Sequence, residues 1–440
     1  MIDHEPEIKV ALLQNYRQST ITLKGIFYLS GRPVPEVINI RSLPGKVALS
    51  DAAGKALASG KTIRLAADRH STFSLDVKIG IGFHWQRIVR QTFPGHIILR
   101  ANPDSSFHLI NEISLEDYLA CVISSEMSAQ APPEFLKAQA ITARSWLVAM
   151  LDRKKRKTSA PQINQTDDNE IIRWHDTNDH SFFDVCADDH CQRYQGLSPI
   201  TSPEVNKAMR TTRGLYLVHN NEICDARYYK ACGGRTENFA AAWEDKSFSY
   251  LQSVSDHSAD YAAISSEDDA AQWLRGKPAA YCNTADRALL GEILPSFDQE
   301  TMNFFRWQVS YGREELEEIL HQKSGIDFGT LQKLTVLQRG PSGRVSKLQI
   351  EGAKRTVTVG KELEIRSWLS PTHLLSSAFV VSAKQSQNGT MESFTLDGGG
   401  WGHGVGLCQI GAAVMAKKGF RAADILAHYF SGATLQKLYE

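Results

Sequence analysis

One acidic residue stands out among the positions that could carry out chemistry. Glu126 lies at the end of the apolar-striped segment 122–127, directly before a predicted loop. A carboxyl group held against apolar neighbours favours its protonated form, which is the form that a general acid needs at neutral pH. The alternative is an exposed glutamate that only ends a helix.

A group of histidines and cysteines follows downstream. His180, Cys186 and Cys191 fall within twelve residues, with His190 adjacent and His175 just upstream. Zinc takes thiolate and imidazole ligands in tetrahedral geometry, and close spacing allows one loop to supply several of them. The spacing therefore predicts a zinc site, although a Cys186–Cys191 disulfide or two free thiols would also fit.

Two glycine-containing segments are further candidates. Residues 398–406 hold six glycines around Trp401 and His403 and match no phosphate-binding pattern, which favours a platform for a sugar or ring. A tight structural loop is the alternative. Residues 228–237 predict a strand that ends in a double-glycine turn, with Cys232, Arg235 and Glu237 at a cleft rim or on a hairpin surface. Cys232 could also be a nucleophile with His403 as its distant base.

The pattern around these residues predicts the elements that must position them. Short apolar runs separated by turn residues predict a β-rich module over residues 1–108. Ser114 and Asp117 have the spacing of a capping box, and Pro133 suits the first turn of a second helix. We therefore expect a helix hairpin with Glu126 at the end of its first helix.

The fold class predicted is α+β, with the helix hairpin packed on a β-rich core. The first part of this core spans 109–256 and contains a polar excursion over 153–196, where zinc would bind. Residues 257–383 are predicted to form an inserted α+β segment. Residues 384–440 are predicted to form the C-terminal part of the core, with a final helix from about Gln409. The basic run 153–157 is expected to be a solvated loop after a helix.

Composition excludes several classes of protein. The 49 basic and 49 acidic residues balance, which argues against a nucleic-acid binder. No segment approaches the roughly 20 apolar residues of a membrane span. The acidic start of the chain does not read as a signal peptide, so we expect either a cytosolic protein or one whose leader has been removed. Seven cysteines are too few for a disulfide scaffold.

Taken together, these segments resemble the SpoIID/LytB family, which comprises stage II sporulation protein D-like lytic transglycosylases and amidase enhancers of peptidoglycan. The similarity runs in order over roughly residues 110–440. Its motifs lie at 115–127, 135–144, 232–237, 400–412 and 425–432. Cys232 and Cys408 stand where the family often has serine, so a thiol-dependent variant is an alternative.

The resemblance implies cleavage of the MurNAc–GlcNAc bond without water, which leaves a 1,6-anhydroMurNAc end. The family's catalytic acid lies in the motif that Glu126 matches. Ordinary glycosidases need two carboxyl groups. In a lytic transglycosylase the C6 hydroxyl of the sugar attacks instead, so one group can act first as acid and then as base.

The resemblance also implies the surroundings of this acid. Zinc is expected on His180, Cys186 and Cys191, in a structural role, or in a water-activating role if only three protein ligands bind. Lys137 and Arg144 are expected to support the helix hairpin. The residues expected to bind substrate are Arg144, Gly233, Gly234, Thr236, Trp401, His403 and Gln409.

The expected partners are peptidoglycan glycan strands and, in one reading, a cell-wall amidase, with no nucleic acid and no membrane span. This substrate implies an extracytoplasmic location, in the periplasm or cell wall. Two other functions are considered. One is a non-catalytic amidase enhancer that binds peptidoglycan, and the other is a hydrolase that depends on Cys232 and His403.

Overall fold

The computed structural model divides the chain into two compact units. Unit 1 comprises Met1–Ala131, Thr177–Leu215 and Lys437–Glu440, and unit 2 comprises Pro132–Asp176 and Tyr216–Gln436. The structure describes residues 3–81, 86–156, 165–167, 169–174, 180–188, 190–200, 202–296, 298–299 and 303–440. Both units combine helices and strands, which confirms the predicted α+β fold class. The domain boundaries expected near 108, 256 and 383 stay predictions.

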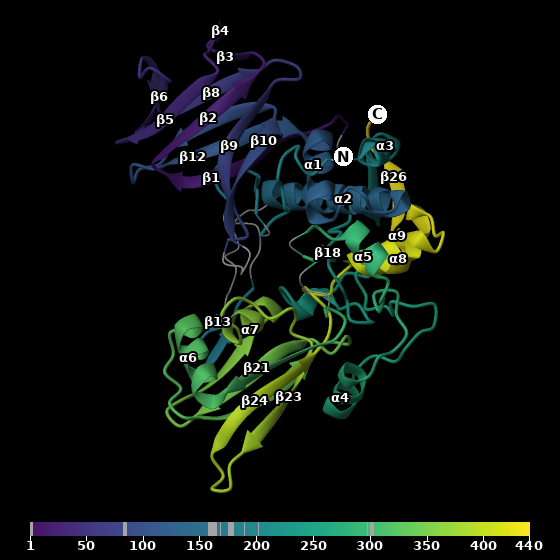
Figure 1. Ribbon diagram of the computed structural model, residues 1–440. Coiled ribbons are helices and arrows are strands. Elements are labelled where there is room, and N and C mark those ends of the chain that lie inside the picture. The colour runs from purple at the N-terminus through teal and green to yellow at the C-terminus, as the bar shows by residue number, and fades with distance from the viewer. Residues whose placement is uncertain are drawn as a thin grey trace. The chain divides into compact units, whose positions relative to one another are not determined.

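Two sheets form most of unit 1 and appear in purple and blue in Figure 1. One has the strand order β15-β1-β12-β11-β8-β3-β4 and the other β10-β9-β2-β5-β6-β7. Buried and exposed residues alternate along most strands, whereas β12 is buried almost throughout. The strands are β1 (Glu7–Tyr16), β2 (Gln18–Lys24), β3 (Phe27–Leu29), β4 (Arg32–Pro33), β5 (Val37–Leu43), β6 (Lys46–Asp51), β7 (Ala56–Gly60), β8 (Thr62–Ala67), β9 (Thr72–Ile79), β10 (Arg87–Pro94), β11 (His96–Ala101), β12 (Phe107–Ser114) and β15 (Val185–Cys186).

Helix α1 (Leu115–Glu126) follows β12 directly in unit 1. The Ser114 hydroxyl accepts a hydrogen bond from the Asp117 amide, so the predicted N-terminal cap is confirmed. The helix ends at Glu126, as the sequence indicated. It packs against α3 (Pro203–Thr212), whose own cap is Ser202.

Helix α2 (Pro133–Arg156) opens unit 2 and begins at the predicted proline. It contacts α8 (Gln409–Lys417) and α9 (Ala422–Tyr429), and Figure 1 shows these helices side by side. The basic run was predicted to be a solvated loop, and this is wrong for residues 153–156. They form the last turn of α2, where cations interact favourably with the helix dipole, and Arg153 pairs with Asp225 at 3.0 Å. Lys157 lies outside the described residues.

The rest of unit 2 is built on small sheets, of which the largest has the order β13-β14-β22-β21-β20. Helices α6 and α7 share an apolar core with this sheet and with the β19-β24-β23 sheet. The smaller sheets are β17-β16-β26 and the parallel pair β18-β25. The bounds are β13 (Gln165–Thr166), β14 (Glu170–Ile172), β16 (Leu215–His219), β17 (Glu222–Ile223), β18 (Tyr228–Tyr229), α4 (Glu267–Arg275), α5 (Arg287–Ile293), β19 (Trp307–Gly312), α6 (Arg313–Ser324), β20 (Leu331–Arg339), β21 (Val345–Gly352), β22 (Thr356–Gly360), α7 (Glu362–Trp368), β23 (Phe379–Gln385), β24 (Met391–Gly398), β25 (Leu407–Cys408) and β26 (Thr434–Lys437).

The polar excursion predicted over 153–196 contributes β13 and β14 to unit 2 and β15 to unit 1. Strand β14 pairs with β22 in unit 2, and β15 pairs with β1 in unit 1. Within the described part of the chain, none of the helices combines the length and apolar character that crossing a membrane requires.

Candidate functional site

Glu126 is the last residue of α1 and is partly buried. The backbone N–H of Arg193 donates a hydrogen bond to its Oε1 atom at 2.9 Å. The neighbouring Ser125 hydroxyl accepts from the Gln195 amide at 3.2 Å. The end of α1 is therefore bonded to the segment 192–195, and the alternative of an exposed, unengaged helix-end glutamate does not hold.

Two stacked tyrosines fasten the same segment. The rings of Tyr118 and Tyr194 lie 5.1 Å apart. The Tyr118 hydroxyl donates to the Gln192 side-chain oxygen at 3.2 Å, and the Tyr194 hydroxyl donates to the Asn111 side-chain oxygen at 2.6 Å. Burial raises the pKa of both hydroxyls well above the ordinary value, so they remain neutral donors. These contacts hold the Arg193 amide in place beside Glu126.

Four metal-ligating side chains come together in the part of unit 1 that precedes this segment. The donor atoms of His180, Cys186, His190 and Cys191 all lie within 4.8 Å of one another. His180 Nε2 is 3.3 Å from Cys191 Sγ, and His190 Nδ1 is 3.5 Å from the same sulfur. Nitrogen and sulfur donors on a tetrahedral zinc ion are separated by about 3.3–3.8 Å. The structure thus unites the three predicted ligands and adds His190 as a fourth.

The chemistry of these four groups fits a metal ion. Hydrogen bonding by Cys191, and then by His180 and His190, holds the pKa of the Cys186 thiol far below its ordinary value despite burial. A thiolate is the form of cysteine that binds metal. Cys186 and Cys191 are free thiols, which contradicts the disulfide alternative. His175, which the sequence also indicated, lies outside the described residues.

The glycine-rich segment belongs to unit 2 and is wound closely around other groups of that unit. Gly404 has φ +85°, and a Cβ atom there would lie 2.5 Å from Cζ of Arg344. Gly406 has φ +83°, and its Cβ would lie 2.2 Å from the carbonyl oxygen of Arg227. Because real Cβ atoms do not approach so closely, both positions require glycine. This packing agrees with the tight-loop alternative, and the sugar platform stays a prediction.

A buried polar network holds the segment in place. Arg344 is wholly buried, and its Nε donates to the carbonyl of Gly402 at 3.1 Å. Its Nη1 donates to the Cys232 carbonyl at 3.2 Å and to the Ser342 hydroxyl at 3.0 Å. Ser342 in turn donates to the Glu237 carboxylate at 2.6 Å. The sequence analysis did not identify Arg344, because nothing local distinguishes it from other basic residues in the strand-rich region.

Glu237 was expected at a cleft rim or on a hairpin surface, and both expectations are wrong. Its side chain is completely buried, and burial raises the pKa of its carboxyl group. Arg235 is also buried and bonds to Ser253 and Ser255. Buried charges need such partners, so these residues stabilise the fold of unit 2.

His403 is partly buried and has both ring nitrogens engaged by the backbone. The Val405 amide donates to Nδ1 at 3.1 Å, and Nε2 lies 3.0 Å from the Tyr228 carbonyl, which assigns the proton to Nε2. Burial, followed by the charges of Arg227 and Arg344, lowers the pKa of His403 well below its ordinary value. A neutral imidazole with both nitrogens bonded in this way is a poor general base, which argues against the Cys232–His403 hydrolase.

The other residues expected to bind substrate are mostly buried. Arg144 is wholly buried in α2, while Thr236 and Gln409 are each 1% exposed. Trp401 is partly buried, and its backbone pairs with Ala231. The backbone of Gly233 packs against that of Gly400, and Gly234 packs against the Trp273 ring. Lys137 forms an ion pair with Glu134 at 2.6 Å. Substrate binding by the predicted residues stays a prediction.

Comparison with known proteins adds to this geometry. The family model described as "Stage II sporulation protein" (SpoIID) matches residues 103–219, and "Domain of unknown function (DUF8618)" matches 237–406. The chain is 27% identical to the stage II sporulation protein D of Bacillus amyloliquefaciens over 79% of this chain and 83% of that protein. The corresponding protein of Bacillus subtilis is 24% identical over 74% and 76%, respectively. Residues 103–219 therefore form a SpoIID family domain, and most of the chain is similar to stage II sporulation protein D.

The chain also resembles the amidase enhancer of Bacillus subtilis, at 25% identity over 71% of this chain and 39% of that protein. The SpoIID match contains Glu126 and all four metal-ligating side chains. The DUF8618 match contains Arg344 and the glycine-rich segment up to Gly406.

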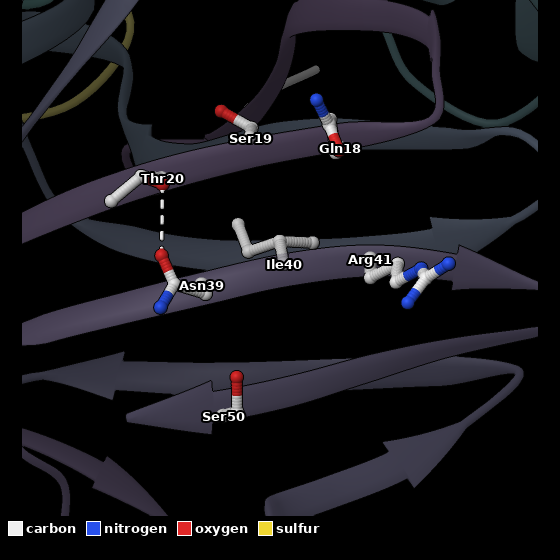
Figure 2. A pocket seen from close by; sticks show the side chains of 7 residues that line it. All are labelled: Gln18, Ser19, Thr20, Asn39, Ile40, Arg41 and Ser50. Carbon is white, nitrogen blue, oxygen red and sulfur yellow. Dashed lines mark hydrogen bonds between the residues drawn. The ribbon is translucent and has the colours of Figure 1, made fainter. Parts of the chain in front are cut away.

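One polar pocket of the chain lies outside both matched segments. It is on the sheet of unit 1, over strands β2, β5 and β6. Figure 2 shows the Thr20 hydroxyl bonded to the Asn39 side chain in this pocket. Its lining offers no carboxylate, thiol or imidazole, so it does not carry acid–base or metal chemistry. The lining residues are Gln18, Ser19, Thr20, Asn39, Ile40, Arg41 and Ser50.

Proposed function

We propose that this SpoIID-family protein is a peptidoglycan lytic transglycosylase that cleaves MurNAc–GlcNAc bonds without water. The observation that carries the proposal is the carboxyl group of Glu126, which lies in the SpoIID-matched segment and is oriented by the Arg193 amide. The relatives named for sporulation and for amidase enhancement support a function in the cell wall. The substrate implies an extracytoplasmic location.

In the proposed reaction Glu126 acts first as a general acid and then as a general base. Its protonated carboxyl group donates a proton to the glycosidic oxygen while the bond from this oxygen to C1 of MurNAc breaks. The C6 oxygen of the same sugar then bonds to C1, and the proton of the C6 hydroxyl passes to the Glu126 carboxylate. The products are a free GlcNAc hydroxyl and a 1,6-anhydroMurNAc end, and the acid is regenerated.

We further infer that His180, Cys186, His190 and Cys191 bind zinc in a structural role. Four protein ligands would close the coordination sphere, which is typical of structural rather than catalytic zinc sites. When bound, zinc would supply folding free energy to this loop. Because Cys191 lies two residues before Arg193, these ligands would help to hold the amide that bonds Glu126.

A second candidate function is a non-catalytic amidase enhancer that binds peptidoglycan and has a cell-wall amidase as its partner. The amidase enhancer among the relatives favours it. It predicts glycan binding without anhydro product, and peptidoglycan release only when an amidase is added. The Cys232–His403 hydrolase is not favoured, because both ring nitrogens of His403 are bonded to the backbone.

The test compares wild-type protein with Glu126→Gln on denuded glycan strands and identifies chain ends by mass spectrometry. Glutamine retains an oxygen that can accept from the Arg193 amide but cannot donate a carboxyl proton. Glu134→Gln is the matched control, because Glu134 is also partly buried and accepts a backbone N–H bond, from Ala422 at 2.9 Å. We expect anhydroMurNAc ends from wild type and control only. Equal product from Glu126→Gln would refute the assignment.

A further inference from the structure

A second group of side chains that could hold a metal ion belongs to unit 2, whereas Glu126 and the histidine–cysteine cluster belong to unit 1. It consists of Cys232, Asp256, Cys282 and Cys408, and all four are buried. One donor atom from each residue lies within 4.8 Å of every other. Cys232 follows β18, Cys408 ends β25, and Cys282 precedes α5. Four segments far apart in the sequence therefore converge on one point.

The distances fit an ion rather than a disulfide bond. The Sγ atoms of Cys232 and Cys282 are 3.4 Å apart, whereas a disulfide requires about 2.05 Å. All three cysteines are free thiols. Two thiolates on a tetrahedral zinc ion are about 3.8 Å apart, since each Zn–S bond is about 2.3 Å long. The close spacing of all four donor atoms suits a single ion, because they could share one coordination sphere.

The hydrogen bonds around the group suit anionic ligands. The Cys232 amide donates to Sγ of Cys408, and the Gly234 amide donates to Sγ of Cys232, each at 3.3 Å. The Asp256 carboxylate accepts from the Cys282 amide at 2.8 Å and from the Tyr429 hydroxyl at 2.6 Å. Such donors orient metal ligands in the second coordination shell and stabilise their charge.

Burial explains why a cation is needed. An isolated charge in a protein interior is costly unless it is paired or binds a metal. Asp256 is wholly buried, and no arginine or lysine forms an ion pair with it among the described residues. A divalent cation shared with three thiolates would neutralise the carboxylate directly. The guanidinium groups of Arg306 and Arg344, which bond to the carbonyls of Gly233 and Cys232, would balance the remaining negative charge.

We propose that Cys232, Asp256, Cys282 and Cys408 form a second, structural zinc site with three sulfur ligands and one oxygen ligand. Four protein ligands leave no open position for substrate or water. The ion would fasten the end of β18 and the start of α8 to the segment that contains Asp256 and Cys282. This proposal does not depend on the proposed transglycosylase activity.

The test measures zinc per chain in protein that carries Cys186→Ser and Cys191→Ser, so that the histidine–cysteine cluster of unit 1 is disabled. We expect one equivalent of zinc to remain and to be released when a mercurial reagent modifies the thiols. Zinc-free protein with these two substitutions would overturn the proposal. This measurement leaves the four proposed ligands unchanged, so it does not depend on whether a variant of them folds.

A second measurement adds Cys282→Ser to the same background and compares it with Cys224→Ser. Cys224 is the matched control, because it is a buried free thiol of unit 2 outside both clusters. We expect Cys282→Ser to lose the remaining zinc and Cys224→Ser to keep it. Equal zinc in both variants, or a disulfide among Cys232, Cys282 and Cys408 in mapped peptides, would overturn the proposal.

Discussion

Gly404 offers a substitution whose effect on stability can be worked out from its contacts. It has φ +85°, and an alanine Cβ would lie 2.5–2.7 Å from three atoms of the Arg344 guanidinium group. An alanine in this region of φ costs about 1–2 kcal/mol, of which about 0.4–1 kcal/mol is offset by the lower entropy of the unfolded chain. The backbone effect alone therefore lowers the free energy of unfolding by about 1 kcal/mol.

Displacement of Arg344 adds a second contribution. The guanidinium group is wholly buried and donates to Gly402, Cys232 and Ser342. A hydrogen bond to a charged group contributes about 1.5–3 kcal/mol, and we expect the Cβ atom to break one or two of these bonds. For Gly404→Ala we predict a total loss of about 2.5–7 kcal/mol, the lower value if one bond breaks and the higher if two break.

The assay is urea denaturation of Gly404→Ala and of the matched control Gly389→Ala. Gly389 has φ +84°, and a Cβ atom there would have no other atom within 4 Å, so this variant isolates the backbone effect. We expect the control to lose about 1 kcal/mol. If the two variants lose the same free energy of unfolding, the described role of Arg344 is refuted.

Three further predictions concern pH, metal and helix capping. The pKa of His403 is lowered in the folded state, so on acidification the unfolded chain takes up a proton first, and the free energy of unfolding should fall as pH drops below about 6.5. Urea denaturation of His403→Gln should show a smaller fall with pH. An equal fall would contradict the lowered pKa of His403. Removal of metal from the histidine–cysteine cluster of unit 1 with a chelator should speed amide hydrogen exchange at Arg193 and leave exchange in strand β21 unchanged, and mass spectrometry can measure both. Unchanged exchange at Arg193 would refute the proposal that these ligands hold its amide in place. Ser114→Ala should lower the free energy of unfolding by about 1 kcal/mol, because the Asp117 amide loses its cap, whereas a neutral effect in urea denaturation would argue against the capping contact.

Local signals explain what could be predicted from the sequence. The cap at Ser114 and the proline at 133 act within a few residues, so the start of each helix and the position of Glu126 at the end of α1 were predicted correctly. The proximity of His180, Cys186 and Cys191 was likewise predicted, because they lie close together in the chain, and their binding of zinc stays a prediction. The sequence places His190 beside them, but only the structure shows that its Nδ1 lies 3.5 Å from Cys191 Sγ.

Non-local packing explains what could not be predicted. Glu237 and Ser342 bond across 105 residues, so no local pattern indicates that Glu237 is buried. Thr236 is 1% exposed, and its hydroxyl accepts from the Val254 amide, so its burial also depends on contacts that no local pattern reveals. Its expected role in substrate binding stays a prediction. The convergence of Cys232, Asp256, Cys282 and Cys408 joins positions up to 176 residues apart, which hydrophobic periodicity does not reveal.

The central claim is that bond cleavage proceeds by internal attack of a sugar hydroxyl with one carboxyl group and without water. Digestion of denuded glycan strands in oxygen-18 water, followed by mass spectrometry of the new chain ends, tests it most directly. The account predicts unlabelled 1,6-anhydroMurNAc ends that disappear with Glu126→Gln. Reducing ends that carry oxygen-18 would identify a hydrolase and contradict the account.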